Sequence, residues 1–185
     1  RSGGSWSQQR KLTGSDSITG DQFGRSVAIS GDTLIVGANA DNMGSISDAG
    51  SAYVYDLSSG TPTVPVATLN NPSPAATDFF GFSVAVSSTR VVVGAYRDDT
   101  GAADAGSAYV YDLTSATPTV PVFTLNNPSP ASGDNFGYSV AVAGDTASMR
   151  STCSTVWTLT EPSAKVVARS TVWTLSTSAL MNGWS

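Results

Sequence analysis

Aspartate residues in glycine-rich loops are the side chains of this chain best suited to chemistry. Of the 14 acidic residues, 13 are Asp. Aspartate in such loops serves backbone turns first and the binding of hard cations second. The chain has no His, which removes His-based catalytic triads, His metal sites and the usual general base. Because no nucleophile is accompanied by a base, the sequence predicts a protein without enzymatic activity of its own.

The charge distribution narrows the classes of partner. The net charge is −5 and is uneven along the chain. Up to Asp145, 13 Asp against six Lys and Arg give −7, whereas after it Glu161 against three basic residues gives +2. An acidic, Arg-poor body argues against nucleic acid, whose phosphates need basic partners. The single cysteine has no partner for an internal disulfide, and no run approaches the roughly 20 apolar residues that span a bilayer.

The chain repeats itself, and the repeat sets the architecture. Each copy begins with Asp-x-Phe-Gly-x-Ser-Val-Ala, and the Phe stands at positions 23, 80 and 136. The period is therefore 57 and then 56 residues. A period of this length indicates one supersecondary unit per copy, stacked as a solenoid or closed as a propeller.

Each copy has the pattern of four short strands. In the second copy the runs are rich in Val, Tyr and Thr and lie at 83–87, 90–95, 106–113 and 121–125. No window places apolar residues at helical spacing. The predicted fold class is therefore all-β, a partial β-propeller of about two and a half four-stranded antiparallel blades. We expect the Phe of each Phe-Gly pair to insert between blades, and the small residues to let neighbouring sheets approach closely.

The spacing also divides the chain. Leu12 precedes its Phe by 11 residues, as Leu69 and Leu125 precede theirs. Ser5–Leu12 is therefore predicted to be the last strand of a preceding blade, so that the chain is a fragment of a longer propeller. Two blades follow, then the start of a third and an aberrant tail. The predicted units are 1–12, 13–69, 70–125, 126–146 and 147–185.

The repeated motifs resemble the FG-GAP repeat. The first two copies contain a Phe-Gly pair followed by a Gly-Ala pair. The Gly-Ala pair lies in Val36-Gly37-Ala38 in the first copy and in Val93-Gly94-Ala95 in the second. Asp-Ala-Gly-Ser-Ala-Tyr-Val-Tyr occurs identically at 48–55 and 104–111. The resemblance covers residues 1–145, and the Thr/Pro-rich spacers are more similar to bacterial members than to animal integrins.

The resemblance implies a fold and a kind of function. FG-GAP repeats build the seven-bladed propeller of integrin alpha subunits and of many bacterial surface and secreted proteins. It implies binding and adhesion to protein or glycan partners, with other propeller blades of the parent chain alongside, and an extracellular or cell-surface location. The chain has no signal segment, which carries no weight for a fragment.

The resemblance also implies calcium, which many of these propellers hold in a loop of the form D-x-D-x-D-G-x-x-D. We align Gly101 and Gly44 with the loop glycine; Tyr96 then replaces the first acid in the second copy. Calcium takes six to eight oxygen ligands, and the second copy matches better than the first. The alternative is that these Asp residues cap turns through their own backbone, as we expect for Asp21, Asp78 and Asp134. The candidate calcium ligands are Asp98, Thr100, Asp104, Asp41 and Asp48.

The last segment departs from the pattern. After Thr146 the third copy should continue with Val-Val-Gly-Ala, but the chain instead contains three of its four Trp, its Glu and its Cys. One interpretation is a divergent terminal cap of the array. The favoured one is a frameshift, because a shifted reading of the codons for 167–174 permits a close match to Gly50–Asp56. In either case 147–185 is predicted to be poorly ordered or loosely packed.

Three functions follow from these patterns. The first is a non-catalytic propeller segment of a secreted or surface protein that acts in adhesion or ligand display. The second is an accessory propeller domain of a larger secreted enzyme. The third is a glycan-binding module, in which Trp6, Tyr96 and Phe82 stack on sugars. An array with bare end faces exposes apolar surface, so we also expect self-association or poor solubility.

Overall fold

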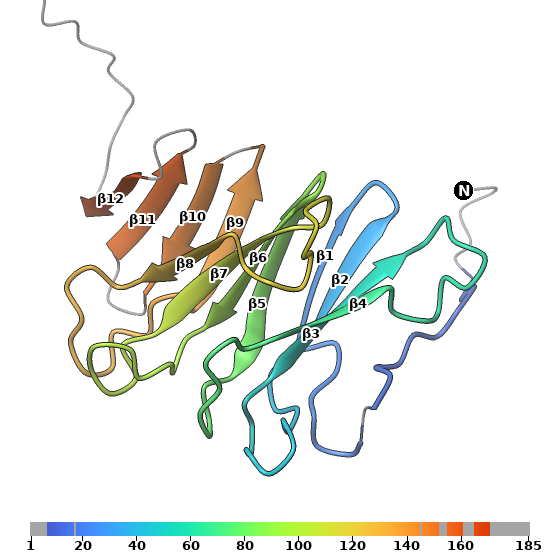
Figure 1. Ribbon diagram of the computed structural model, residues 1–185, viewed down its shortest axis with the longest axis horizontal. Coiled ribbons are helices and arrows are strands. Elements are labelled where there is room, and N and C mark those ends of the chain that lie inside the picture. Colours follow the sequence, from blue (N-terminus) through green and yellow to red (C-terminus); the bar gives the residue numbers. More distant parts are fainter. Residues whose placement is uncertain (1–6, 17, 145, 152–154, 161–164, 171–185) are drawn as a thin grey trace, which may run out of the picture.

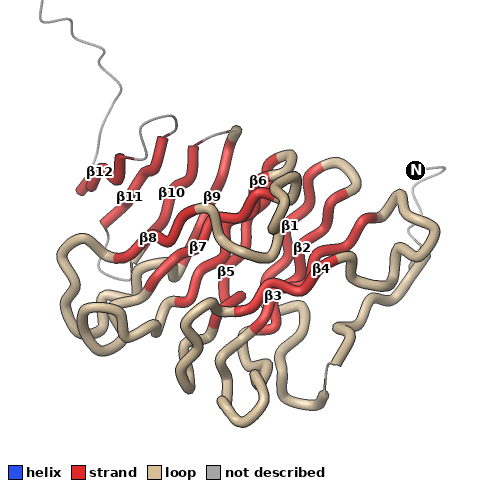
Figure 2. Tube along the Cα trace, in the orientation of Figure 1, coloured by secondary structure: helices blue, strands red, loops and turns tan. Residues whose placement is uncertain are grey.

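The computed structural model contains three four-stranded antiparallel sheets that follow one another along the chain (Figures 1 and 2). It describes residues 7–16, 18–144, 146–151, 155–160 and 165–170. In each sheet the strands pair in chain order, as in a propeller blade. Blade 1 comprises β1 (Ser26–Ser30), β2 (Thr33–Ala38), β3 (Ser51–Asp56) and β4 (Ala67–Asn70). Blade 2 comprises β5 (Phe80–Ser87), β6 (Arg90–Ala95), β7 (Ser107–Asp112) and β8 (Phe123–Asn126). Blade 3 comprises β9 (Ser139–Ala143), β10 (Thr146–Arg150), β11 (Thr155–Thr160) and β12 (Lys165–Ser170).

The local sequence explains the hairpins. Ser30 pairs with Thr33, so two residues connect β1 and β2, and Gly31 has a φ of 58°. Two-residue hairpin loops favour a positive φ, which glycine adopts at no steric cost. In blade 2 the same place holds Ser88, with a φ of 53°. The first strands of the three blades lie side by side, since β5 contacts both β1 and β9.

The blades pack face to face, and the Phe of the Phe-Gly pair lies in each interface. Phe80 is fully buried in a cluster that joins Ile35 and Val54 of blade 1 to residues of blade 2. Phe136 is fully buried in the equivalent cluster between blades 2 and 3, against Val92. Full burial of such a side chain contributes about 1.5–3 kcal/mol. The structure confirms the expected place of these two rings.

Two glycines allow the sheets to approach at backbone distance. A Cβ on Gly37 would overlap the carbonyl oxygen of Gly81, and one on Gly94 would overlap that of Gly137. The same carbonyls accept hydrogen bonds across the interface. Ser26 Oγ donates to the Gly81 oxygen, and the equivalent Ser83 donates to Gly137, both at 2.7 Å. These contacts explain why the Val-Gly-Ala motif recurs.

The segment before blade 1 was predicted to be the last strand of a preceding blade, and that prediction stays untested. Residues 7–12, its described part, form no strand. A strand needs a hydrogen-bonded neighbour, and no other strand of a preceding blade is among the described residues. The segment instead covers part of blade 1, because Leu12 packs against Tyr53 and Tyr55 and the Tyr55 hydroxyl donates to the Thr13 carbonyl at 2.8 Å.

The segment after Thr146, which was predicted to be poorly ordered or loosely packed, contains strands in its described part. It supplies β10, β11 and β12, which complete a third blade. Ala147 and Met149 of β10 are buried against blade 2. The physical reason is that β9 offers an open edge, and β-branched runs such as 155–160 pair readily. Residues 171–185 lie outside the described part, and the frameshift stays a prediction. No helix among the described residues is long and apolar enough to cross a membrane.

Candidate binding site

The first calcium-ligand prediction concerns Asp98, which the structure places in a buried turn. One carboxylate oxygen accepts hydrogen bonds from the backbone N–H and the hydroxyl of Thr100. The other accepts from the Tyr109 hydroxyl at 2.6 Å. Asp98 is only 5% exposed. Both oxygens therefore already have protein donors, and the carboxylate ties the loop to β7.

Asp41 repeats this arrangement in blade 1. Its Oδ2 lies 3.0 Å from the Tyr53 hydroxyl, which also lies 2.7 Å from Asp16 Oδ1. Burial, followed by the nearby carboxylates, raises the pKa of both Tyr53 and Tyr109 above its ordinary value. These tyrosines therefore stay protonated and donate to carboxylates at neutral pH. The Asp–Tyr bond was not predicted, although an Asp precedes the Tyr by 12 residues in the first copy and by 11 in the second.

Asp104 and Asp48 mark the other end of the same loops. Both have positive φ, 53° in each case. The Asp104 backbone N–H donates to Asp99 Oδ1 at 2.8 Å, and that of Asp48 donates to Asn42 Oδ1 at 2.9 Å. The Asp104 carboxylate lies 3.9 Å from the Arg97 guanidinium. The side chains of Asp99 and Asn42 thus satisfy the backbone of these loops.

The residues as arranged do not fit a calcium site. Calcium takes six to eight oxygens, whereas the oxygens of Asp98 accept from Thr100 and Tyr109 and Asp104 lies beside a cation. Within the described part of the chain, no three His, Cys, Asp or Glu side chains are grouped to hold a metal. Binding at 98–104 or 41–48 would require these loops to rearrange, so calcium stays a prediction that a titration can test.

The Asp before each Phe-Gly pair stabilises a turn. Asp78 is 2% exposed, and its Oδ2 accepts from the Ala75 backbone N–H and from Asn71 Nδ2, both at 2.7 Å. Asp134 accepts the equivalent bonds, and Asp21 accepts from a backbone N–H. Burial first, and then the charges of neighbouring Asp residues, raise the pKa of Asp78 to about 6. These aspartates hold the loop that delivers Phe-Gly to the interface.

A different set of residues forms the strongest candidate for ligand contact. The residue directly after each Phe-Gly pair is Arg25 in blade 1, Phe82 in blade 2 and Tyr138 in blade 3. Because neighbouring blades repeat the same backbone, these three side chains form a row. The Arg25 guanidinium lies 4.4 Å from the centre of the Phe82 ring, and the Phe82 and Tyr138 ring centres are 5.0 Å apart.

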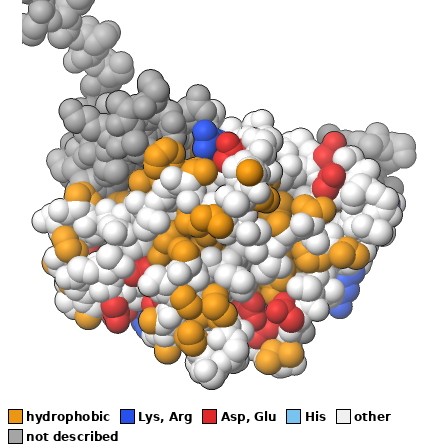
Figure 3. Space-filling view, in the orientation of Figure 1, with side chains coloured by type: hydrophobic (Ala, Val, Ile, Leu, Met, Phe, Trp, Pro, Cys, Tyr) orange, Lys and Arg blue, Asp and Glu red, His pale blue; other side chains and the backbone are white. Residues whose placement is uncertain are grey.

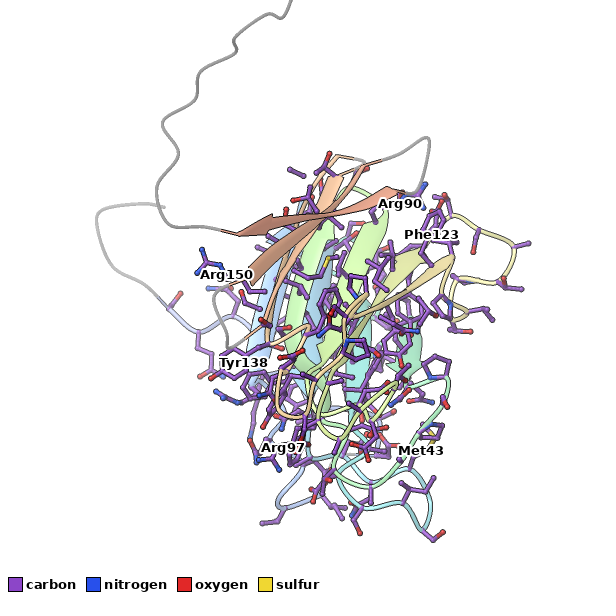
Figure 4. The ribbon with its side chains drawn as sticks, turned by 90° about the vertical axis from the view of Figure 1, so that its left-hand side faces the viewer. Met43, Arg90, Arg97, Phe123, Tyr138 and Arg150 are labelled. Carbon is purple, nitrogen blue, oxygen red and sulfur yellow. The ribbon has the colours of Figure 1, made fainter. Side chains whose placement is uncertain are left out.

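Blade 2 extends the row with three more side chains. Tyr96 lies 4.4 Å from Phe82 and 5.4 Å from Tyr138 between ring centres. Phe79 stacks on Tyr96 at 5.7 Å and 13°, and the Arg97 guanidinium lies 5.4 Å from the Phe79 ring. Figure 4 shows Tyr138 and Arg97 on one side of the molecule, away from Phe123. We name the set the rim platform. Its members are Arg25, Phe79, Phe82, Tyr96, Arg97 and Tyr138.

The backbone of Phe79 is unusual and favours a role for its ring. Phe79 has a φ of 54°, a conformation that bulky residues rarely adopt. The same place holds Gln22 in blade 1 and Asn135 in blade 3, with φ of 56° and 54°. Asn tolerates this conformation better than Phe does. A Phe here costs about 1 kcal/mol, and its ring stacks on Tyr96.

The platform tyrosines differ from the other tyrosines. The hydroxyls of Tyr53, Tyr55, Tyr109 and Tyr111 all lie within hydrogen-bonding distance of protein oxygens. Among the described residues, the Tyr96 and Tyr138 hydroxyls have no such partner. Tyr138 is 43% exposed. The platform thus combines one exposed ring, three half-buried rings, two hydroxyls without a partner in the described part of the chain and two guanidinium groups.

Part of this site is readable from the sequence. Tyr96 and Phe82 were predicted to be exposed aromatic residues; the structure brings them together but leaves both half-buried. The other members, Arg25, Phe79, Arg97 and Tyr138, were not predicted, although the change of residue type at one fixed position of each copy was a readable signal. Trp6 lies outside the described residues.

The surface around these features is mixed. Figure 3 shows hydrophobic side chains in separate patches on one face of the molecule, with a group of acidic side chains at the lower edge, over the loops. The fold therefore places the chain in the class of repeat proteins with a partial β-propeller fold.

Comparison with known proteins names the family. The family model described as FG-GAP repeat matches residues 6–55 and 65–111, and this chain belongs to that family. No curated protein matches the sequence closely enough for comparison.

Solved structures share the fold. A chain in the crystal structure of the mitotic checkpoint complex is 14% identical to this chain, with a TM-score of 0.50. The match covers 78% of this chain and 37% of the checkpoint chain, so this chain spans little more than a third of the length of that protein. The computationally designed Ika4 protein is 13% identical with a TM-score of 0.52, and the match covers 87% of this chain and 78% of that one.

Proposed function

We propose that this chain is a non-catalytic binding segment of an FG-GAP propeller in a secreted or cell-surface protein, and that the rim platform is its ligand-contact surface. The location rests on the general association of FG-GAP repeats with extracellular proteins. The binding role rests on how the copies differ from one another.

One observation carries the proposal. Residues that are the same in the first two copies, such as Phe80, Gly37 and Gly94, are used in packing between blades. The position after Phe-Gly carries a different residue in every copy and lies on the rim. A position that varies while its backbone repeats is released from packing constraints. Loops and rims of rigid scaffolds are where binding residues concentrate.

The experiment is a binding screen with matched variants. The 185-residue chain is applied to an array of extracellular matrix proteins and glycans beside an R25Q/Y138A variant. The control is R10Q/V120A, which removes one exposed Arg and one exposed apolar side chain elsewhere. We expect at least one ligand whose signal falls about tenfold or more with the platform variant and persists with the control. Signals equal in all three proteins would contradict the proposal.

A further inference from the structure

The rim platform has the chemistry of a site for an acidic saccharide. We propose that it binds a carbohydrate bearing a carboxylate or sulfate group, whose ring stacks on the exposed Tyr138 ring while its anionic group pairs with Arg25. This inference rests on the proposed function and names its ligand class.

The aromatic rings of the platform suit the apolar face of a sugar. The C–H face of a pyranose is apolar, and an aromatic side chain offers a rigid apolar face with a polar tip. The ring centres of Phe82, Tyr96 and Tyr138 lie 4.4–5.4 Å from one another. The Tyr96 and Tyr138 hydroxyls, which have no partner among the described residues, are positioned to hydrogen-bond with sugar hydroxyls.

The arginines of the platform suit the anionic group of the ligand. The Arg25 guanidinium lies over the Phe82 ring, 4.4 Å from its centre, and Arg25 is exposed, so its N–H groups can reach a carboxylate. The ion pairs in the described part of the chain are Arg90–Asp112 and Arg97–Asp104, so Arg25 takes part in neither. The charge of Arg97 is partly compensated by the Asp104 carboxylate, which lies 3.9 Å from the guanidinium. The exposed Arg25 guanidinium can therefore form a charge-assisted pair with an anionic group of a ligand.

Size favours a saccharide over a protein. A stable protein interface buries about 800 Å² per partner. The platform consists of six side chains, three of them rings in mutual contact, and matches one or two sugar units better. An acidic peptide is therefore the alternative outcome of the test.

The test uses four probes with the full chain. These are trigalacturonate, its methyl ester, a Glu-rich peptide of equal charge and inorganic phosphate. Affinity is measured by calorimetry, and saturation-transfer NMR reports whether sugar protons lie against protein rings. We expect trigalacturonate to bind about tenfold more tightly than its ester, with saturation transfer to the sugar C–H protons.

Variants locate the site. R25Q should abolish the preference for trigalacturonate over its ester, whereas R10Q should keep it. Y138A should weaken both sugars and reduce saturation transfer. Because Arg25 and Tyr138 are exposed, thermal unfolding of these variants should match that of the control, which excludes a loss of fold as the cause.

Each other outcome overturns the inference in a distinct way. Equal affinity for trigalacturonate and for its methyl ester would contradict the proposed role of Arg25. Equal binding of the peptide or phosphate would show a general anion site. The chain could fail to bind these sugars while its ligand from the array still depends on the rim platform. That result would reject the ligand class and leave the proposed function standing. Loss of both would reject the two together.

Discussion

The interface between blades 2 and 3 and the outward face of blade 3 use equivalent strand positions in opposite ways. In β6, Gly94 admits the backbone of the next blade, and Val92 is fully buried beneath that blade. The equivalent residues of β10 are Arg150 and Ser148, of which Arg150 is exposed. At this position the interface between blades 2 and 3 leaves no room for a side chain, whereas the Arg150 side chain lies on the surface. The same strand position is thus part of an interface in blade 2 and of the surface in blade 3, with a different residue in each.

The outward face of blade 1 differs from both. Val27 and Ile29 of β1 are 59% and 60% exposed. The equivalent residues Val84 and Val86 of β5 are partly buried against blade 1. β1 therefore presents the apolar pattern of a blade interface, whereas the equivalent face of β10 carries the polar residues Ser148 and Arg150. The outward faces of these two strands are chemically unequal.

The largest expected effect comes from placing the blade 3 residue in the interface. G94R should destabilise the protein by more than about 4 kcal/mol or detach blade 3, because a side chain there overlaps the Gly137 backbone. Urea unfolding with limited proteolysis measures this. The control is G60R, since a Cβ on Gly60 meets nothing within 4 Å. Equal stability of the two variants would refute our account of the glycine.

The second prediction compares the interface with the rim. F136A should cost about 3–5 kcal/mol, because it removes a fully buried ring. Y138A, two residues along the chain, should cost less than about 1 kcal/mol, because Tyr138 is 43% exposed. Thermal unfolding of both variants provides the measurement. A cost for Y138A as large as that for F136A would mean that the platform belongs to the core.

The third prediction concerns the two end faces. V27K/I29K should reduce self-association, because it removes exposed apolar surface from blade 1. S148V/R150G should increase it, because the outward face of β10 then resembles that of β6. Sedimentation velocity at several concentrations compares both with the parent chain. Association that is unchanged by V27K/I29K would show that another surface is responsible.

A smaller effect is expected from pH. The pKa of Asp78 is raised from 3.8 to about 6 in the folded chain, chiefly by burial. The folded state therefore binds the proton more tightly than the unfolded state does. The contribution of Asp78 to stability is full below about pH 4 and is lost as the pH rises through 6. Urea unfolding between pH 4 and 7 should show this fall, and D78N should flatten it. A steeper fall in D78N would contradict the assignment.

The smallest effect is expected from calcium. With the oxygens of Asp98 held by Thr100 and Tyr109, millimolar calcium should shift the unfolding temperature by less than about 1 °C. Thermal unfolding with calcium or with chelator measures the shift, and D98N is the matched variant. A rise of several degrees that D98N abolishes would establish that the loop rearranges around the metal.

Much of the fold was predictable because the repeat displays it. The Val-rich and Tyr-rich runs of the second copy form β5 to β8, and Phe80 and Phe136 lie between blades as expected. Two segments were less readable from the sequence. The opening segment forms no strand in its described part, since strand pairing needs a neighbour that local sequence does not supply. β10 to β12 formed despite an aberrant composition, since pairing tolerates many side chains when an open edge is present.

The candidate site was less predictable than the fold. Arg25, Phe82 and Tyr138 lie 57 and 56 residues apart, and only the stacking of blades brings them within 5 Å between neighbouring groups. The buried bonds from Tyr53 and Tyr109 to loop carboxylates likewise depend on how each loop folds back on its strand.

The sequence by itself determined the repeat, the strands and the residues that can lie between blades, because these follow from local spacing and side-chain volume. Tertiary structure decided which repeated positions face a neighbour and which face solvent. Gly94 and Arg150 occupy equivalent strand positions, yet only the presence of another blade makes one of them part of an interface. The rim platform exists for the same reason, since its parts come from three blades and meet only once the blades are stacked.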